Sequence, residues 1–283
     1  MDKLVELKNI SKVYTNKNVL RNISLTINKK QILAILGGNG TGKSTLLRMI
    51  AGIERPSSGK VNYPNKNIKI GYVPERFPKN IRFTPSEYLL YMGRMSGNSK
   101  GYLIQKIDDL LHRFQLDGLK NQRIMELSKG SIQKVGLIQA ILQNPNLLIL
   151  DEPLAGLDSE AQEALVKIIG ELKQQGSTIL LTYHESNIFE SIVENTFYLD
   201  HGNISEIESI KKETIKLLVV RNVEKSLVKG WEEILQVEEK DKQLSLYVPV
   251  KESDVVLSRV LQLKGSIEAV STVKLDDDME RMI

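Results

Sequence analysis

The stretch QILAILGGNGTGKSTLLRMIAG, residues 31–52, decides the fold that the sequence predicts. It opens with an apolar run that stops in two glycines, which is the pattern of a buried strand followed by a tight loop. The segment GKSTLLRMIAG then places apolar residues at helical spacing and ends at Gly52. A buried strand, a glycine loop and a helix open a βαβ unit, so we expect a mostly parallel α/β domain.

The glycine loop of this stretch, GGNGTGKST at residues 37–45, fits the phosphate-binding pattern G-x-x-x-x-G-K-[ST]. Its glycines let consecutive backbone N–H groups turn toward one anion at the N-terminus of the following helix. Lys43 adds a positive charge for the β- and γ-phosphates, and the Ser44 hydroxyl is the expected Mg²⁺ ligand. A glycine-rich turn that merely contains Lys-Ser is the alternative, but the strand before it and the helix after it are the context that the motif requires.

A second chemical signal is NLLILDEP, residues 146–153, where an apolar strand ends in two adjacent carboxylates. From the carboxyl end of a strand, Asp151 can reach Mg²⁺ through water, and Glu152 can orient or deprotonate the water that attacks the γ-phosphate. Seen alone, this pair would indicate a solvated acidic turn. Because it shares a chain with a phosphate loop, the sequence favours hydrolysis of ATP with Mg²⁺.

Two regions of different character follow from the patterns along the chain. Residues 1–204 contain both signals, a first antiparallel β-subdomain and a helical insertion at about 75–135, in which Tyr88 and Tyr91 are expected in the core. Residues 205–283 show the order β-α-β-β-α-β, which is that of a ferredoxin-like unit. We therefore expect an ATP-binding α/β domain over 1–204 and a small C-terminal α+β accessory domain over 205–283.

Composition excludes several classes of protein. With 41% hydrophobic and 26% charged residues, the 283-residue chain is neither disordered nor collagen-like. No apolar run reaches the ~18 residues of a membrane span, and the N-terminus lacks an apolar signal segment, so we expect a cytoplasmic chain. Residues 205–283 carry 13 Lys and Arg against 16 Asp and Glu, so the net charge of +4 arises in residues 1–204, where an anionic ligand would bind.

With these motifs placed, residues 1–204 resemble the nucleotide-binding subunit of an ATP-binding cassette (ABC) transporter, with the motifs in family order. The resemblance implies a RecA-like P-loop fold in which Tyr14 stacks on adenine. It implies that the nucleotide is bound by the whole loop, which comprises Gly37, Gly38, Asn39, Gly40, Thr41, Gly42, Lys43, Ser44 and Thr45. In the same way, Asp151 and Glu152 match the Walker B pair, His184 matches the histidine that contacts the γ-phosphate, and Asp158 lies in the loop that crosses a dimer interface.

The stretch LSKGSIQKV, residues 127–135, predicts a helix that begins with Ser128 as its cap. It resembles the family's LSGGQ signature, which implies that Ser128 and Gly130 bind the γ-phosphate of an ATP held by the partner subunit. Lys129 and Ser131 depart from that signature. Glu75 is a further departure, because the family usually has a glutamine that contacts Mg²⁺ and signals to the membrane subunit; a carboxylate still offers an oxygen ligand.

The resemblance implies an ATP hydrolase that closes as a homodimer or heterodimer around MgATP and drives separate membrane-spanning subunits from the inner face of the cell membrane. The departures and the C-terminal extension favour the branch that exports antibiotics, peptides or lipids, and no nucleic-acid partner is expected. A soluble ABC-type ATPase acting on ribosomes or nucleic acid is the alternative, although the chain has neither two cassettes nor a long coiled-coil insertion. A module that binds ATP with negligible turnover is a third possibility, against which Glu152 argues.

Overall fold

The computed structural model describes residues 2–15, 17–183, 188–207, 215–228, 230–231, 233–240 and 243–273. The chain divides into two compact units, Met1–Glu208 and Ser209–Ile283. The strands of the first unit are β1 (Lys3–Tyr14), β2 (Lys17–Asn28), β3 (Ile32–Leu36), β4 (Ser58–Asn62), β5 (Ile70–Val73), β6 (Leu147–Leu150), β7 (Thr178–Leu181), β8 (Asn195–Asp200) and β9 (Asn203–Ile207). Its helices are α1 (Lys43–Ile50), α2 (Pro85–Met95), α3 (Lys100–Arg113), α4 (Lys129–Leu142) and α5 (Ser159–Gln174).

The first unit is built on two sheets. A six-stranded sheet has the order β5-β6-β7-β3-β8-β9, and all its neighbouring strands are parallel except β8 and β9. A three-stranded antiparallel sheet has the order β2-β1-β4. Because β3 lies inside the larger sheet and runs directly into the glycine loop, the loop emerges at the carboxyl ends of the parallel strands, where open α/β sheets bind ligands.

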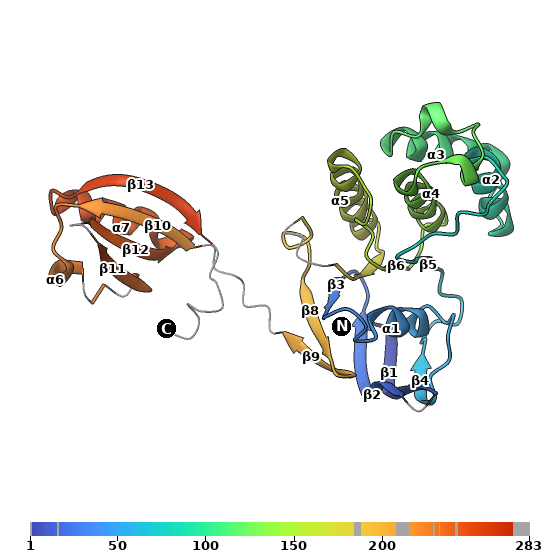
Figure 1. The fold of residues 1–283 in the computed structure, drawn as a ribbon, viewed down its shortest axis with the longest axis horizontal. Coiled ribbons are helices and arrows are strands. Elements are labelled where there is room, and N and C mark those ends of the chain that lie inside the picture. The colour runs from blue at the N-terminus through green and yellow to red at the C-terminus, as the bar shows by residue number, and fades with distance from the viewer. Residues whose placement is uncertain are drawn as a thin grey trace. The chain divides into compact units, whose positions relative to one another are not determined.

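The strands β3, β6 and β7 of the six-stranded sheet are buried on both faces, which explains their continuous apolar sequences. Successive residues of β3 alternate between two hydrophobic cores, since Ile32 and Ala34 pack with α4 and α5 whereas Leu33 and Ile35 pack with α1 and the strands of the smaller sheet. Figure 1 shows this arrangement, with α1 beside β1 and β4, and α2, α3 and α4 grouped together above β5 and β6. The strand and helix predicted in residues 31–52 are confirmed.

The helical insertion begins with strong local signals. Thr84 and Glu87 form a capping box at the start of α2, with Pro85 in the first turn, and Ser99 caps α3. On α2, Tyr88 is half-buried and its hydroxyl donates to Gln139 at 2.6 Å, whereas Tyr91 is 58% exposed. The prediction that Tyr91 lies in the core was therefore wrong, because its ring packs against Phe83, which is itself exposed, and not against the buried residues of the core.

The second unit has the element order β10 (Ile215–Arg221), α6 (Lys225–Val228), β11 (Gln236–Lys240), β12 (Gln243–Pro249), α7 (Ser253–Gln262) and β13 (Ser266–Val273). Its strands form one antiparallel sheet in the order β11-β12-β10-β13. Alternate residues of β10 and β12, including Leu218, Val220, Leu244 and Leu246, pack against Val256 and Val260 of α7. This unit thus has a hydrophobic core of its own.

Within the part of the chain that the structure describes, no helix combines the length and the apolar character that crossing a bilayer requires.

Candidate functional site

The glycine loop joins β3 to α1 in a backbone conformation that requires glycine. Gly37 has φ 145°, and a Cβ added there would lie 2.3 Å from the carbonyl oxygen of Leu199. Gly42 precedes α1 with φ 109° and provides no side-chain cap, so the first amides of this helix keep their hydrogen-bonding capacity for an anion. Gly38, Asn39 and Gly40 are exposed at the tip of the loop.

The polar side chains of the loop are held by their own backbone. Lys43 is 5% exposed, and its ammonium donates to the carbonyl oxygens of Gly37 at 2.8 Å and Gly38 at 3.1 Å. The hydroxyl of Thr41 donates to the same Gly38 carbonyl at 2.9 Å. Thr45 is buried and Ser44, which precedes it in the first turn of α1, is half-buried. The loop is thus already folded around one fixed positive charge.

The two adjacent carboxylates follow β6, and that of Glu152 lies beside this charge. Glu152 Oε1 is 3.9 Å from Lys43 Nζ. Asp151 is buried, and its carboxylate accepts a hydrogen bond of 3.0 Å from the hydroxyl of Thr182, which in turn accepts one of 2.9 Å from the Glu152 amide. Glu152 has φ 48°, a conformation that is strained for a residue with a side chain and that occurs preferentially at functional sites. Thr182, directly after β7, therefore orients the Asp151 carboxylate and fixes the backbone of Glu152.

The donor set suits a magnesium ion bound together with a nucleotide. No group of three or more His, Cys, Asp or Glu side chains in the described ranges is arranged to hold a metal. Mg²⁺ is commonly held by one or two protein oxygens, by water and by substrate phosphates, and not by a cage of carboxylates. Ser44, directly after Lys43 in the chain, and Asp151, directly before Glu152, offer such oxygens. The negative charge of Asp151 is also felt nearby, since burial and then this charge raise the pKa of Tyr72 to about 12.

Glu75, the third predicted metal residue, lies in the loop after β5 and is exposed. Its carboxylate is 3.5 Å from the Arg76 guanidinium. The loop itself is held by Gln133 of α4, whose amide donates to the Pro74 carbonyl at 3.2 Å and whose oxygen accepts from the Phe77 amide at 3.3 Å. The segment that carries Glu75 is thus attached to the helix that begins with Ser128.

The signature turn begins α4 as predicted, with Ser128 as its cap. The Ser128 hydroxyl accepts a hydrogen bond of 3.1 Å from the Ser131 amide, which confirms the predicted cap. A Cβ added to Gly130 would lie 2.3 Å from the carbonyl oxygen of Gly156, so glycine is required here by a close approach within the same chain. The signature turn and the LAGLD loop at residues 154–158 therefore contact each other directly.

Asp158 strengthens this contact. It caps α5 by accepting a hydrogen bond of 2.9 Å from the Ala161 amide, and it also accepts one of 2.8 Å from Lys134 of α4. The hydrogen bond from Lys134, followed by the one from Ala161, lowers the pKa of Asp158. The two loops that the family resemblance assigns to a dimer interface are joined by this ion pair.

Tyr14 ends β1 and is 39% exposed. His184 lies outside the described residues.

The sequence patterns did not identify three residues that organise the site, namely Thr182, Gln133 and Lys134. The sequence did carry one signal for these residues, namely a polar residue among apolar ones. Gln133 and Lys134 are buried on a helix with aliphatic neighbours, and Thr182 is buried directly after an apolar strand.

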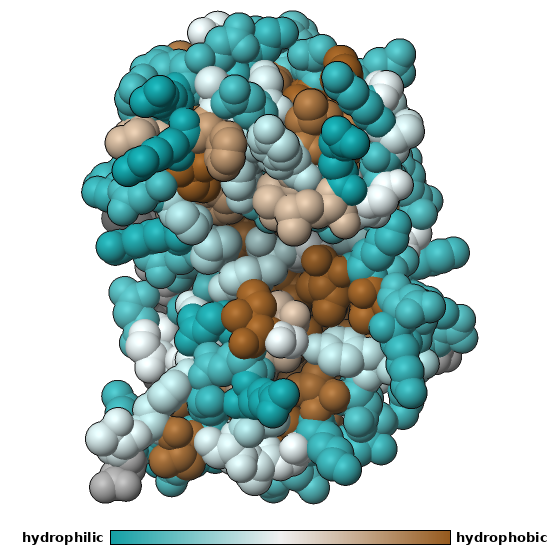
Figure 2. Space-filling view, turned by 90° about the vertical axis from the view of Figure 1, so that its right-hand side faces the viewer, coloured by the Kyte–Doolittle hydropathy of each residue, from teal (hydrophilic) through white to brown (hydrophobic). Residues whose placement is uncertain are grey.

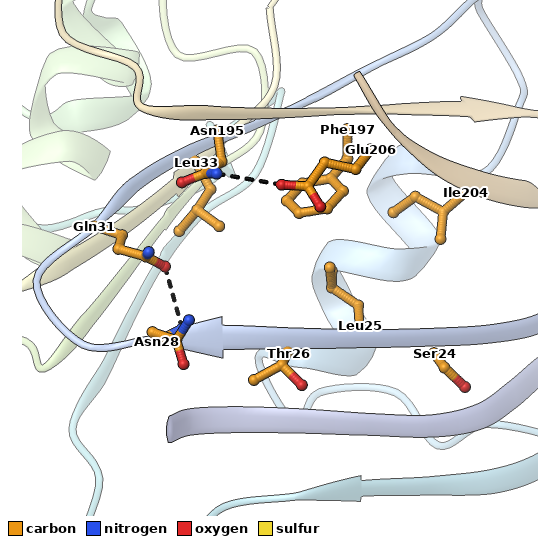
Figure 3. A pocket seen from close by; sticks show the side chains of 10 residues that line it. All are labelled: Ser24, Leu25, Thr26, Asn28, Gln31, Leu33, Asn195, Phe197, Ile204 and Glu206. Carbon is orange, nitrogen blue, oxygen red and sulfur yellow. Dashed lines mark hydrogen bonds between the residues drawn. The ribbon is translucent and has the colours of Figure 1, made fainter. Parts of the chain in front are cut away.

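A cleft of about 340 Å³ lies elsewhere in the first unit, among β2, β3, β8 and β9. Figure 3 shows its polar lining. The Asn195 side-chain amide donates to the Glu206 carboxylate at 3.2 Å, and the Asn28 backbone amide donates to the Gln31 side-chain oxygen at 3.3 Å. Leu33 and Asn195 lie near the amino ends of their strands, whereas the glycine loop follows the carboxyl end of β3. This cleft is therefore separate from the phosphate loop.

A glycine loop between a buried strand and a helix, with a fixed lysine beside one of two adjacent carboxylates, defines a P-loop nucleotide-binding protein. The family model described as ABC transporter matches residues 20–155. The ABC transporter ATP-binding protein YhaQ of Bacillus subtilis is 30% identical over 93% of this chain and 92% of its own length. The zinc import ATP-binding protein ZnuC of Pasteurella multocida is 40% identical over 65% of this chain and 68% of its own.

A solved structure, described as an ATP-binding subunit of an ABC transporter, is 29% identical with a TM-score of 0.68, over 74% of this chain and 92% of that one. The chain belongs to the family of ABC transporter ATP-binding proteins. It has the P-loop ABC ATPase fold, and it is an ATP hydrolase that uses ATP with Mg²⁺. ATP-binding subunits of this family dimerise and work with membrane subunits. The comparisons do not favour the alternative of an ATPase acting on ribosomes or nucleic acid.

Proposed function

We propose that the first unit hydrolyses ATP with Glu152 as the general base and with Lys43 and Asp151 as its electrostatic partners. The observation that carries this proposal is the placement of Glu152, which Thr182 and a left-handed backbone hold 3.9 Å from the lysine of the phosphate loop. There Glu152 can take a proton from the attacking water while Lys43 balances the charge of the phosphates. Ser44, Asp151 and Glu75 would hold Mg²⁺, which when bound would supply positive charge against the phosphates.

The remaining binding residues act in a dimer. Tyr14 stacks on adenine of the ATP held by its own chain, whereas Ser128, Gly130 and Asp158 complete the site of the partner chain. Support comes from the contact of Gly130 with Gly156 and from the 2.8 Å ion pair between Lys134 and Asp158, which join the signature turn and the LAGLD loop into one surface. The role of His184 at the γ-phosphate rests on the family resemblance.

The helical insertion docks the membrane subunit. The Ile124 amide donates to the Phe83 carbonyl at 2.9 Å, so the segment before α2 lies beside the segment before α4. Phe83 is 48% exposed, and its ring centroid is 5.4 Å from that of the exposed Tyr91. Figure 2 views the molecule from the side on which α2 and α3 lie in Figure 1, and hydrophobic residues are exposed there between hydrophilic ones. Exposed aromatic pairs of this kind favour a protein partner.

The Glu75 loop would report nucleotide state to that partner. It is hydrogen-bonded to Gln133, five residues after the cap Ser128, so movement of α4 at the dimer interface would move the loop as well. Through this connection the chain, placed on the inner face of the cell membrane, would drive a membrane-spanning partner. The second unit is assigned as an accessory domain with a ferredoxin-like fold, which its element order and its strand order β11-β12-β10-β13 support.

Export is the proposed direction of transport. It rests on the resemblance carried by Lys129, Ser131, Glu75 and the C-terminal extension. The similarity to ZnuC covers 65% of this chain and so leaves about a third of it unmatched, whereas that to YhaQ, whose name gives no direction of transport, covers 93%. Import of zinc is the second candidate, favoured by the name and the 40% identity of ZnuC. Measurement of zinc uptake in cells that carry only Glu152→Gln separates the two, because an importer loses uptake whereas an exporter retains it and accumulates its cargo.

The ATPase assignment is tested with Glu152→Gln in the full chain. We expect the steady-state rate of ATP hydrolysis to fall by about 10²–10⁴-fold, while ATP still induces a dimer on size-exclusion chromatography. Glu163→Gln, at an exposed position of α5, is the matched control and should hydrolyse ATP at the normal rate. A rate for Glu152→Gln close to that of the unmodified chain would refute the assignment of the base.

A further inference from the structure

The ring of Tyr14 is held on one side by a group of charged residues that no sequence motif includes. Lys12, two residues earlier on β1, places its ammonium over the Tyr14 ring, 5.0 Å from the ring centroid. The Tyr14 hydroxyl donates a hydrogen bond to the carboxylate of Glu54. Glu54 follows the end of α1, where its amide donates to the Arg48 carbonyl at 3.2 Å. Two segments distant in sequence thus meet at this tyrosine.

Glu54 is the centre of this group. Its side chain is 19% exposed and pairs with Lys12 at 2.9 Å and with Arg48 at 3.0 Å. Burial by itself would raise the pKa of Glu54, but the hydrogen bonds from Tyr14, Lys12 and Arg48 outweigh it and lower that pKa to about 2. Glu54 is therefore a carboxylate at every pH at which the protein would work, and it is a permanent acceptor for the tyrosine hydroxyl.

The same group reaches the phosphate loop. Arg48 Nη2 donates to the hydroxyl of Thr45 at 3.2 Å, and Thr45 is the last residue of the loop motif. A continuous set of contacts thus runs from the Tyr14 ring through Glu54 and Arg48 to the residue that follows Ser44. One nucleotide would be bound at the two ends of this set of contacts, with its base at the Tyr14 ring and its triphosphate at the phosphate loop.

We propose that Glu54 is a positioning residue that orients the Tyr14 ring for adenine and sets its distance from the phosphate loop. This inference rests on the proposed contact of Tyr14 with adenine. Lys12 covers one face of the ring, so the base stacks on the other face, and the cation on the covered face adds to the attraction that an aromatic ring offers. Without Glu54 the ring keeps its area but loses the hydrogen bond that selects one orientation, so binding of the base weakens while the phosphate contacts remain.

The test compares ATP with a ligand that has no base. For Glu54→Ala in the full chain, we expect KM for ATP to rise about three- to tenfold with little change in kcat, and the inhibition constant of magnesium tripolyphosphate to stay within experimental error. Glu6→Ala is the matched control, because Glu6 also pairs with two lysines from β1, Lys3 at 2.8 Å and Lys8 at 3.0 Å, but makes no contact with Tyr14. An unchanged KM for ATP, or an equal loss of ATP and tripolyphosphate binding, would overturn the proposal.

Two further variants make the result independent of folding defects and of the proposed function. Tyr14→Phe removes only the hydroxyl, leaves the charged pairs intact and should raise KM for ATP in the same direction; in the double variant with Glu54→Ala the two effects should not add. If Tyr14→Phe behaves as the unmodified chain, Glu54 does not orient the ring. Tyr14→Ala tests the contact between Tyr14 and adenine. A normal KM for ATP in this variant would refute that contact and the inference with it. A raised KM in Tyr14→Ala, together with a normal KM in both Glu54→Ala and Tyr14→Phe, would refute the inference alone.

Discussion

Two polar turns of the first unit begin helices, and they use the first amides of those helices differently. The phosphate loop enters α1 through Gly42, which offers no side-chain cap, whereas the signature turn enters α4 through Ser128, whose hydroxyl accepts from the Ser131 amide at 3.1 Å. An anion site needs several converging donors. The phosphate loop thus leaves the first amides of α1 available for an anion bound by its own chain. The signature turn already satisfies one amide internally and, under the proposed dimer, adds to a site built by another chain.

The largest expected effect separates the lysines of the two turns. Lys43→Ala removes the buried ammonium of the phosphate loop and should lower the rate of ATP hydrolysis by about 10²–10³-fold, measured by phosphate release. Lys129→Gly, at the exposed lysine of the signature turn, should change the rate by no more than about twofold. Equal losses in the two variants would show that the turns are equivalent and that the comparison is wrong.

The close approach of the signature turn to the LAGLD loop gives the next effect. Gly130→Ala would place a Cβ 2.3 Å from the Gly156 carbonyl and should lower the free energy of unfolding by about 1–3 kcal/mol. Gly170→Ala, in α5, meets no atom within 4 Å and should instead raise that free energy by about 0.5–1 kcal/mol. Urea denaturation of both variants measures the difference, and equal stability of Gly130→Ala and the unmodified chain would contradict the contact.

The cap of the signature turn can be compared with an ordinary cap. Ser128→Ala and Ser99→Ala each remove a hydroxyl that accepts a first-turn amide, from Ser131 and Tyr102 respectively, and each should lower the free energy of unfolding by about 1 kcal/mol. Only Ser128→Ala should also lower ATP turnover, because only Ser128 would face a nucleotide in the dimer. Normal turnover in Ser128→Ala would mean that its hydroxyl serves α4 alone.

The smallest effect depends on pH. The hydrogen bond from Lys134, with that from Ala161, lowers the pKa of Asp158 in the folded state, so its stabilising contribution is present above the unfolded pKa of about 3.9 and is lost as the pH falls through the lower folded value. Because the Asp158 side chain is 57% exposed, solvent screening limits this contribution to about 1 kcal/mol or less. Asp158→Asn should therefore lower the urea midpoint at pH 7 and have a diminishing effect below about pH 4.

Asp108→Asn is the control for this measurement, since Asp108 pairs with Lys120 at 3.2 Å on an exposed surface and caps no helix. Its effect at pH 7 should be the smaller of the two. A pH-independent effect of Asp158→Asn would show that the cap, and not the charge, carries the contribution.

The motifs contiguous in sequence were predicted best. The strand, loop and helix of residues 31–52 and the cap at Ser128 are confirmed, because each depends on the apolar period or on a side chain that reaches its own backbone. The ATP and Mg²⁺ assignments are confirmed by the family. Tyr91 was placed in the core because helical spacing identifies an apolar stripe but not whether another element covers it.

Local patterns in the chain were enough to predict the class of protein, the phosphate loop and the strand that ends in two carboxylates, since these follow from apolar periodicity and from backbone geometry that only certain residues adopt. The tertiary structure alone decided which distant side chains hold those groups: Thr182 on Glu152, Gln133 on the Glu75 loop, Lys134 on Asp158 and Glu54 on Tyr14. Such pairs join residues up to 59 positions apart, and no local pattern records them, because a hydrogen bond depends on distance in space and not on separation along the chain.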